Sequence, residues 1–201
     1  AGEPAIVANG FDGLEVISIA DFELTAEAST FGMMTANLPA DAEIVLPGNL
    51  PSANGLNATY SAKTSLVVFD NLGSKRLVDV YFTKTGQHDW EVAVYDQSLA
   101  TPGTSFPYGA GGLLTSISLE FDPTSGKLTP ASADSLSFQV LNGGNFELDL
   151  SATSQFATSF DIYSSTVNGN APTTIDRIQI SGDGVVSALY KNGTEKKLYR
   201  I

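Results

Sequence analysis

The sequence contains no cysteine and only one histidine, His88, among its 201 residues. The lack of cysteine excludes disulfides, thiolate metal sites and cysteine nucleophiles. One histidine cannot supply a histidine-rich zinc site, and a Ser-His-Asp triad would have to use His88, which lies in a predicted turn at residues 86–89. No Gly-x-Ser-x-Gly elbow accompanies it. These absences disfavour hydrolytic and zinc-dependent chemistry.

Positive charge is also scarce, with 10 Lys and Arg against 22 Asp and Glu and a formal net charge of -12. A surface this negative repels phosphate backbones and anionic lipid, so neither nucleic acid nor a membrane is an expected partner. No run approaches the roughly 18 apolar residues of a membrane span, and no basic, hydrophobic signal peptide opens the chain. The chain begins at Ala1 without Met, which predicts a fragment or a processed form.

Apolar residues alternate with polar ones along most of the chain. The apolar residues make up 42% of the sequence, which is enough for a packed core. Trp90, Val92 and Val94 point to one side of a predicted strand, and this period of two is typical of half-buried antiparallel strands. The segment 22–38 is the one helix candidate, but it lacks a 3.6-residue period and its threonines favour a strand. Strands are predicted at 14–19, 22–38, 65–69, 76–83, 90–95, 117–121, 136–140, 146–150, 175–180, 185–191 and 195–201.

Turn residues separate these strands. The structural turn positions are Asp70, Gly73, Asp122, Gly126, Asp183, Gly184, Asn192 and Gly193. Glycine supplies a positive φ there, and the aspartates bond nearby backbone N–H groups. A carboxylate pair of the glycosidase type is formally available, but the turns already account for these aspartates. No EF-hand spacing or phosphate-binding glycine loop is present, so no catalytic residue, cofactor or metal is expected.

Two segments, 38–62 and 100–112, are predicted loops, rich in proline, glycine and small polar residues. The second loop carries two aromatic residues, Phe106 and Tyr108. Their rings either fold back onto a sheet or contact a partner. We take both as candidate subunit-interface residues.

Several segments share a pattern with a known family. In the C-terminal third these are FELDLSATSQFATSF (146–160) and IQISGDGVVSALYKNGTEKKLYRI (178–201), with the Asp183-Gly184 and Asn192-Gly193 turns as the most specific part. In the middle they are SLVVFDNLGSKRLVDVYFTKTGQHDWEVAVYD (65–96) and ISLEFDPTSGKLT (117–129). Together they resemble the bacterial flagellar hook protein family over somewhat more than half of the chain. The helical segments at both ends of that family are not found in this sequence.

The resemblance implies an all-β fold of two sandwich-like or barrel-like domains, the second inserted into the first. An inner hook domain would comprise 1–24 and 146–201, and an outer hook domain would comprise 25–145. The chain would cross between them near Leu24 and Asn145. The predicted strand at 14–19 needs a sheet to join, and the C-terminal hairpins offer one.

The same resemblance implies a structural subunit of the flagellar hook, the flexible universal joint between the motor rod and the filament. Such a protein is no enzyme, is exported by the flagellar secretion system and is extracellular. Its partners would be other hook subunits, rod proteins and hook–filament junction proteins, and without the terminal helices this chain would be monomeric. The alternative is a secreted carbohydrate-binding or adhesin-type β-sandwich that stacks sugars on Phe106, Tyr108 or Trp90. A glycosidase is a third reading.

Overall fold

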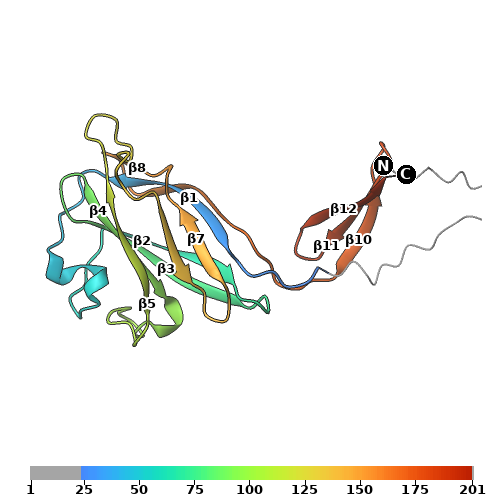
Figure 1. Cartoon of the computed structure of the whole chain (residues 1–201), viewed down its shortest axis with the longest axis horizontal. Coiled ribbons are helices and arrows are strands. Elements are labelled where there is room, and N and C mark those ends of the chain that lie inside the picture. Colours follow the sequence, from blue (N-terminus) through green and yellow to red (C-terminus); the bar gives the residue numbers. More distant parts are fainter. Residues whose placement is uncertain (1–23, 201) are drawn as a thin grey trace, which may run out of the picture. The chain divides into compact units, whose positions relative to one another are not determined.

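The computed structural model describes residues 24–200, which separate into two compact units. The larger unit is Ala26–Ala171, and the smaller one contains, of the described residues, 24–25 and 172–200 (Figure 1). Helical structure in the described part is limited to three short 3-10 turns, η2 (Pro47–Asn49), η3 (Pro51–Ala53) and η4 (Gln97–Leu99). The predicted all-β fold is therefore confirmed.

The first sheet of the larger unit is an antiparallel meander of four strands in the order β2-β3-β4-β5. The strands are β2 (Ala62–Phe69), β3 (Lys75–Lys84), β4 (Asp89–Asp96) and β5 (Leu113–Glu120). Strict alternation places Val78, Val80 and Phe82 on one face of β3, and Leu77, Asp79 and Tyr81 on the other. All four strands match segments that the alternation predicted.

The second sheet of the larger unit gathers strands that are far apart in the sequence. Its strands are β6 (Ser135–Gln139), β7 (Asn145–Asp149), β1 (Phe31–Pro39), β8 (Ser154–Phe156) and β9 (Asp161–Val167). The strand β1 lies in its centre, parallel to β7 and β8 and antiparallel to β9. The strand in the 22–38 segment is confirmed over β1. Parallel pairing was not predicted from the sequence, and β8 and β9 were missed.

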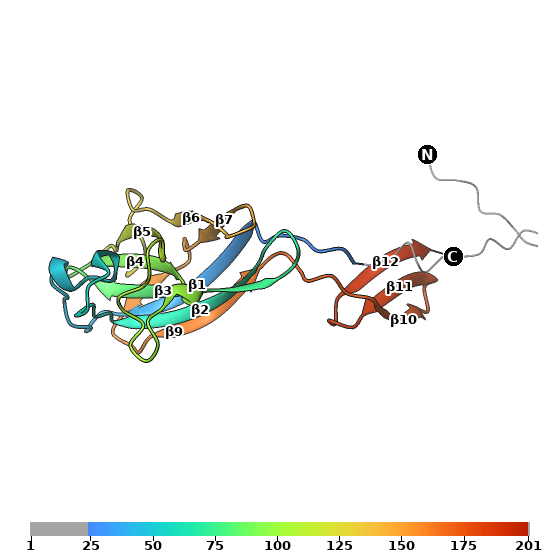
Figure 2. The ribbon, with the colours of Figure 1, turned by 90° about the horizontal axis from the view of Figure 1, so that it is seen from below.

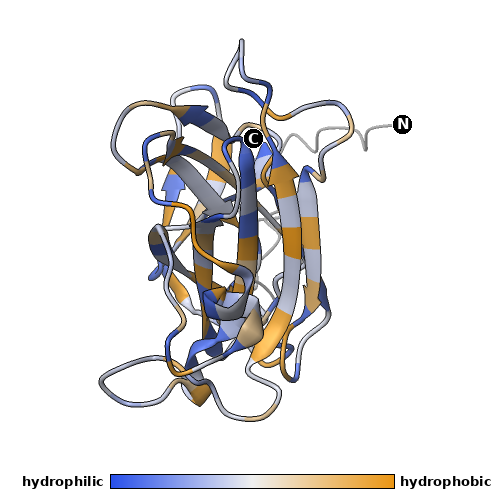
Figure 3. Ribbon diagram, turned by 90° about the vertical axis from the view of Figure 1, so that its left-hand side faces the viewer, coloured by the Kyte–Doolittle hydropathy of each residue, from blue (hydrophilic) through white to orange (hydrophobic). Residues whose placement is uncertain are grey.

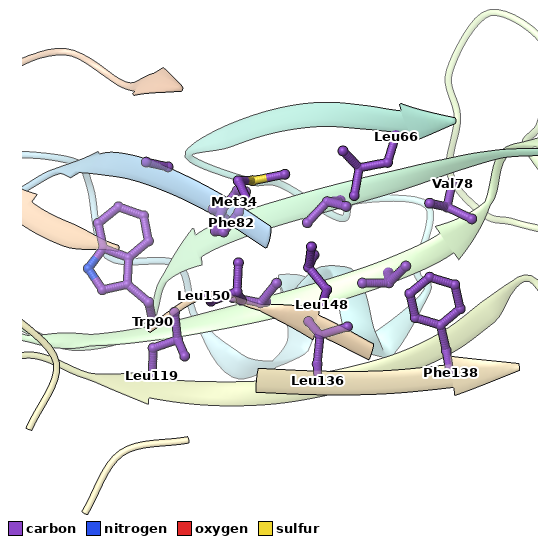
Figure 4. Packing of buried hydrophobic residues seen from close by; sticks show 14 of the residues in the cluster. Met34, Leu66, Val78, Phe82, Trp90, Leu119, Leu136, Phe138, Leu148 and Leu150 are labelled. Atoms are coloured by element: carbon purple, nitrogen blue, oxygen red, sulfur yellow. The ribbon is translucent and has the colours of Figure 1, made fainter. Parts of the chain in front are cut away.

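The two sheets enclose the main core of the larger unit. Figure 4 shows Phe82, Trp90 and Leu119 of the first sheet pointing into the same space as Leu136 and Leu148 of the second. Trp90 and Leu148 are completely buried. The alternating hydropathy along the strands is visible as bands in Figure 3. A sandwich buries one face of each sheet in this way, so inward-facing residues alternate with outward-facing ones.

The smaller unit contains an antiparallel sheet of three strands in the order β10-β11-β12 (Figure 2). The strands are β10 (Ile175–Ile180), β11 (Val185–Tyr190) and β12 (Glu195–Arg200), as the alternation predicted. Gly184 (φ 80°) and Gly193 (φ 86°) occupy the two hairpin turns. The side chain of Asn192 accepts a 3.0 Å hydrogen bond from the Thr194 N–H, and Ser181 donates to Asp183. The predicted strand at 14–19 lies outside the described residues.

The predicted turn aspartates of the larger unit close its hairpins. Asp70 Oδ1 accepts hydrogen bonds from the N–H groups of Leu72 (3.0 Å) and Ser74 (2.8 Å), and Asp122 Oδ1 accepts from those of Thr124 and Ser125. Backbone hydrogen bonds, from Ser74 above all, hold the pKa of Asp70 below its usual value. Gly73 (φ 75°) and Gly126 (φ 66°) provide the left-handed backbone that these turns need.

The second crossing between the units differs from the prediction. The sequence analysis placed it near Asn145, with 146–201 in one domain, but the chain leaves the larger unit at 171–172. The strands β7, β8 and β9 all pair with β1, and Phe146 and Leu148 are fully buried in the main core. The segment 146–171 therefore belongs to the same unit as 26–145.

Gly169 lies just after the end of β9, beside the segment 27–29 that precedes β1. It has φ +90°, and a Cβ atom there would lie 2.8 Å from the Glu27 carbonyl oxygen and from two atoms of Ser29. Gly169→Ala is expected to destabilise the larger unit by about 1–3 kcal/mol, because both the backbone conformation and the space exclude a side chain. Urea unfolding followed by Trp90 fluorescence measures this.

The matched control for Gly169 is Gly48→Ala. No heavy atom lies within 4 Å of the position that a Cβ would take at Gly48, and its φ is not positive. We expect its unfolding free energy to stay within about 0.5 kcal/mol of the parent. An equal loss of unfolding free energy in Gly169→Ala and Gly48→Ala would contradict the predicted strain at Gly169.

Candidate functional site

The described residues hold no obvious catalytic or metal-binding group. His88 is half-buried, and its Nδ1 lies 3.4 Å from Gln155 Nε2. Residues 24–200 contain no group of three or more His, Cys, Asp or Glu side chains placed to hold a metal ion. Over the same range, no helix has the length and apolarity that crossing a membrane requires. The features of the described residues that remain to carry a function are the covered and the exposed faces of the larger unit.

A second apolar cluster covers part of the outer face of the first sheet. Tyr81, Ala93 and Tyr95 from β3 and β4 meet Phe106 and Tyr108 from the 100–112 loop. The ring centroids of Tyr95 and Tyr108 are 4.2 Å apart, and Tyr81 meets Phe106 at 5.0 Å. Such tilted and edge-on ring pairs stabilise a packed cluster beyond the area that they bury. The loop is thus held onto the sheet.

Phe106 and Tyr108 are each only 4% exposed. Of the two possibilities that the sequence analysis left open, the structure shows the first, with both rings folded back onto the sheet. The physical reason is that Tyr81 and Tyr95 leave a large apolar surface on this face, which the loop covers. The role of Phe106 and Tyr108 in a subunit interface stays a prediction that the structure does not test.

The loops 40–61 and 100–112 hold each other in place over the sheet. Asn54, at φ 50°, donates from Nδ2 to the Tyr108 carbonyl (2.9 Å) and accepts from the Tyr108 N–H (2.7 Å). The Ser52 N–H donates to Glu91 Oε1 of β4 at 3.1 Å, and the Tyr95 hydroxyl donates to the Pro51 carbonyl. These bonds satisfy polar groups that the loops bury, and they order segments that the sequence marks as irregular.

A buried carboxylate lies at the edge of this aromatic cluster. Asp79 of β3 is fully buried and accepts four side-chain contacts, which come from Lys63 (2.8 Å), Ser65 (2.6 Å), Gln97 (2.9 Å) and Tyr108 (2.6 Å). Burial raises the pKa of Asp79, but these donors outweigh it and hold the pKa below the usual value. Asp79 is therefore a charged structural anchor, with its oxygens occupied and poorly suited to accept a substrate proton.

Two tyrosines of this cluster, Tyr95 and Tyr108, have raised pKa values and stay protonated. Burial raises the pKa of Tyr95 to about 12, with a further contribution from Glu91. Burial also raises the pKa of Tyr108, helped by its hydrogen bond to Asp79. The Tyr81 and Tyr108 hydroxyls are 2.7 Å apart. Hydrogen bonds and ring contacts in this cluster thus hold the 100–112 loop against the first sheet.

Sequence reasoning missed the Lys63–Asp79 pair. The available signal was a single acidic residue inside the otherwise apolar strand 76–83, at a position that alternation assigns to the outer face. The register of β2 against β3 brings Lys63 beside Tyr81 and Ser65 opposite Asp79. Gln97 and Tyr108 contact Asp79 from segments outside these two strands. No local sequence pattern predicts these two contacts.

Comparison with known proteins finds a family model that matches most of the larger unit. The family model described as "Flagellar basal body protein FlaE D2 domain" matches residues 37–170. A flagellar hook protein FlgE of Brucella abortus is 35% identical over 94% of this chain and 42% of its own length. The FlgE of Escherichia coli is 28% identical over the whole of this chain and 48% of its own length. The chain thus spans less than half of these relatives.

A solved structure shares the fold. The crystal structure of Helicobacter pylori flagellar hook protein FlgE2 superposes with a TM-score of 0.54, and the match covers 70% of this chain and 32% of that one. Sequence identity over the match is 19%, so this likeness concerns the fold alone.

Proposed function

Because the chain belongs to the flagellar hook protein family, we propose that it is part of a structural subunit of the flagellar hook, the flexible joint between the rod and the filament. The observation that carries this proposal is the match of the FlaE D2 family model to 37–170, which nearly coincides with the compact unit Ala26–Ala171. A closed sandwich with braced loops and no assembled catalytic group in the described residues suits a mechanical role.

We propose that the two units correspond to two domains of the hook subunit. The unit Ala26–Ala171 would be an outer hook domain, and 172–200 would be part of an inner hook domain with residues near the N-terminus. The chain passes between the units twice, at 25–26 and 171–172. Two covalent connections would limit the reorientation of one domain against the other without preventing it, as a bending joint requires.

Location and partners follow from the same proposal. The protein would be exported by the flagellar secretion system and would stand outside the cell, in contact with other hook subunits and with rod and hook–filament junction proteins at the two ends. The chain by itself would be largely monomeric, no enzyme and without a cofactor, because single contacts between its copies would be weak. Its net charge of -12 supports a soluble surface with weak contacts between neighbours.

The sugar-binding alternative is not favoured. It requires exposed aromatic rings as stacking platforms, and Trp90, Phe106 and Tyr108 are between 0% and 4% exposed. Trp90 Nε1–H donates to Gln155 Oε1 at 2.9 Å inside the main core. A ligand could reach this ring only by opening the sandwich.

Deleting the gene that encodes this chain from its own bacterium tests the proposal. We expect cells without hooks or filaments by electron microscopy, and recovery of both when the gene is returned on a plasmid. Normal hooks in the deletion strain would overturn the proposal, provided that the genome carries no second hook gene.

A further inference from the structure

A shallow hollow lies on the outer face of the first sheet, beyond the part that the loops cover. Its volume is about 330 Å³, and it is lined by residues of β2 and β3 and by the segment around η4. Val67 and Leu77 pair across the two strands, and they are 40% and 43% exposed. Lys75 follows on the same face of β3 and is exposed. We call Val67, Leu77 and Lys75 the Leu77 hollow.

Other charged groups at the Leu77 hollow are already engaged. Arg76 lies 3.7 Å from the Asp70 carboxylate, and Asp96 accepts hydrogen bonds from the N–H and hydroxyl of Ser98. Within residues 24–200, no carboxylate forms an ion pair with Lys75. The hollow therefore combines an apolar floor with Lys75, a cation that has no ion-pair partner among the described residues, in a protein with more than twice as many acidic as basic residues.

A ridge with the opposite character lies on the outer face of the second sheet. Phe31 and Met33 of β1 are 43% and 41% exposed, although the alternate residues Gly32 and Met34 are buried. The parallel register places Glu147 of β7 beside Phe31, and Glu147 is exposed. No ion pair to Glu147 is found among the described residues. We call Phe31, Met33 and Glu147 the Phe31 ridge.

We propose that the Phe31 ridge of one copy of this protein binds the Leu77 hollow of a second copy. The apolar side chains of the ridge cover Val67 and Leu77, and Glu147 approaches Lys75. This contact removes two exposed apolar strips from water and pairs two charges that lack partners within the described chain. The inference rests on the proposed function only in taking a second copy as the partner.

Charge selects this pairing over the symmetric ones. Two ridges placed face to face would bring Glu147 against Glu147, and two hollows would bring Lys75 against Lys75, both unfavourable. The ridge and the hollow lie on the outer faces of different sheets of one sandwich. A copy that uses its ridge therefore keeps its hollow free for the next copy, so the contact repeats without closing on itself. Such a head-to-tail contact suits a tubular assembly.

The lack of cysteine allows a direct test by disulfide trapping. The 201-residue chain is prepared with Met33→Cys on the ridge or Leu77→Cys in the hollow, and the two variants are mixed and oxidised. The mixed disulfide is expected to form on the order of tenfold faster than in a control that mixes Met33→Cys with Leu56→Cys, because docking raises the effective concentration of one thiol beside the other. Leu56 is 83% exposed and lies on neither face.

Two results would overturn the proposal. A mixed-disulfide rate equal to that of the control means that the faces do not meet, and faster coupling of Leu77→Cys with itself means that the contact is symmetric. Thermal unfolding of each reduced variant, expected near the parent value, shows that the faces compared are intact.

Exchanging the charges of Lys75 and Glu147 gives an independent test of the same contact. Adding Lys75→Glu to the Leu77→Cys variant is expected to slow trapping severalfold, and adding Glu147→Lys to the Met33→Cys partner is expected to restore it. Failure of the restoration would contradict the Lys75–Glu147 pairing. If trapping fails while the deletion strain still lacks hooks, the proposed function stands and only this contact is rejected.

Discussion

Trp90→Ala is expected to destabilise the larger unit by about 3–5 kcal/mol, as truncation of a fully buried aromatic residue does. Trp90 is 0% exposed, lies in β4 of the first sheet and donates to Gln155 in β8 of the second. The substitution therefore opens a cavity between the sheets and removes the donor to Gln155. At about 2–4 °C per kcal/mol for a unit of this size, the melting temperature falls by about 6–20 °C.

Calorimetry is the suitable measurement, since Trp90 is the only tryptophan and the variant loses its fluorescence. Leu56→Ala is the matched control, and its melting temperature should not move, because Leu56 is 83% exposed. Trp90→Phe keeps most of the apolar ring but leaves Gln155 without the indole donor, so an intermediate loss is expected. A change of less than about 1 kcal/mol in the alanine variant would be inconsistent with a closed core around Trp90.

Asp79→Ala is expected to cost about 1–3 kcal/mol, since it leaves the partly buried Lys63 ammonium and the buried Tyr108 hydroxyl without their acceptor. Lys63, Ser65 and Tyr108 all point at the Asp79 carboxylate, at 2.6–2.8 Å. Urea unfolding followed by Trp90 fluorescence measures the loss. Asp161→Ala, at the exposed start of β9, is the control and should change stability by less than about 0.5 kcal/mol.

Acid should weaken the same network. The pKa of Asp79 is lowered in the folded chain relative to its ordinary value of 3.8. Its contribution is therefore complete above that ordinary value and is lost as the pH falls through the folded value. We expect the parent to lose stability below about pH 4, and Asp79→Asn to lose less over that interval, because it has no proton to take up. Parallel acid profiles in parent and variant would contradict this assignment.

The acid profile is not expected to become flat in Asp79→Asn. Asp70 and Asp122 also have lowered pKa values, caused first by backbone hydrogen bonds from Ser74 and from Ser125. Both aspartates are ionised in the folded state and become protonated in acid, so each also contributes to the acid profile. The difference between parent and variant, and not the profile of either alone, therefore reports on Asp79.

The candidate contact faces could be predicted from the sequence only in part. Alternation along 76–83 assigns Leu77 and Asp79 to one face, but it cannot say that a loop covers one of them and leaves the other open. Likewise, Phe31 and Glu147 share a face only because β1 and β7 pair in parallel, across more than a hundred residues of chain. No local pattern encodes such a pairing.

The sequence by itself determined most of the strands, the turns and the all-β class, because these depend on neighbours within a few residues. The period of two in β7 and the Asp70 turn are examples, and the lack of cysteine excluded disulfides outright. The tertiary structure alone decided the partners of β1, the second crossing at 171–172 and the burial of Phe106 and Tyr108. Each of these depends on which distant surfaces exclude water together, and that becomes settled only when the whole core forms.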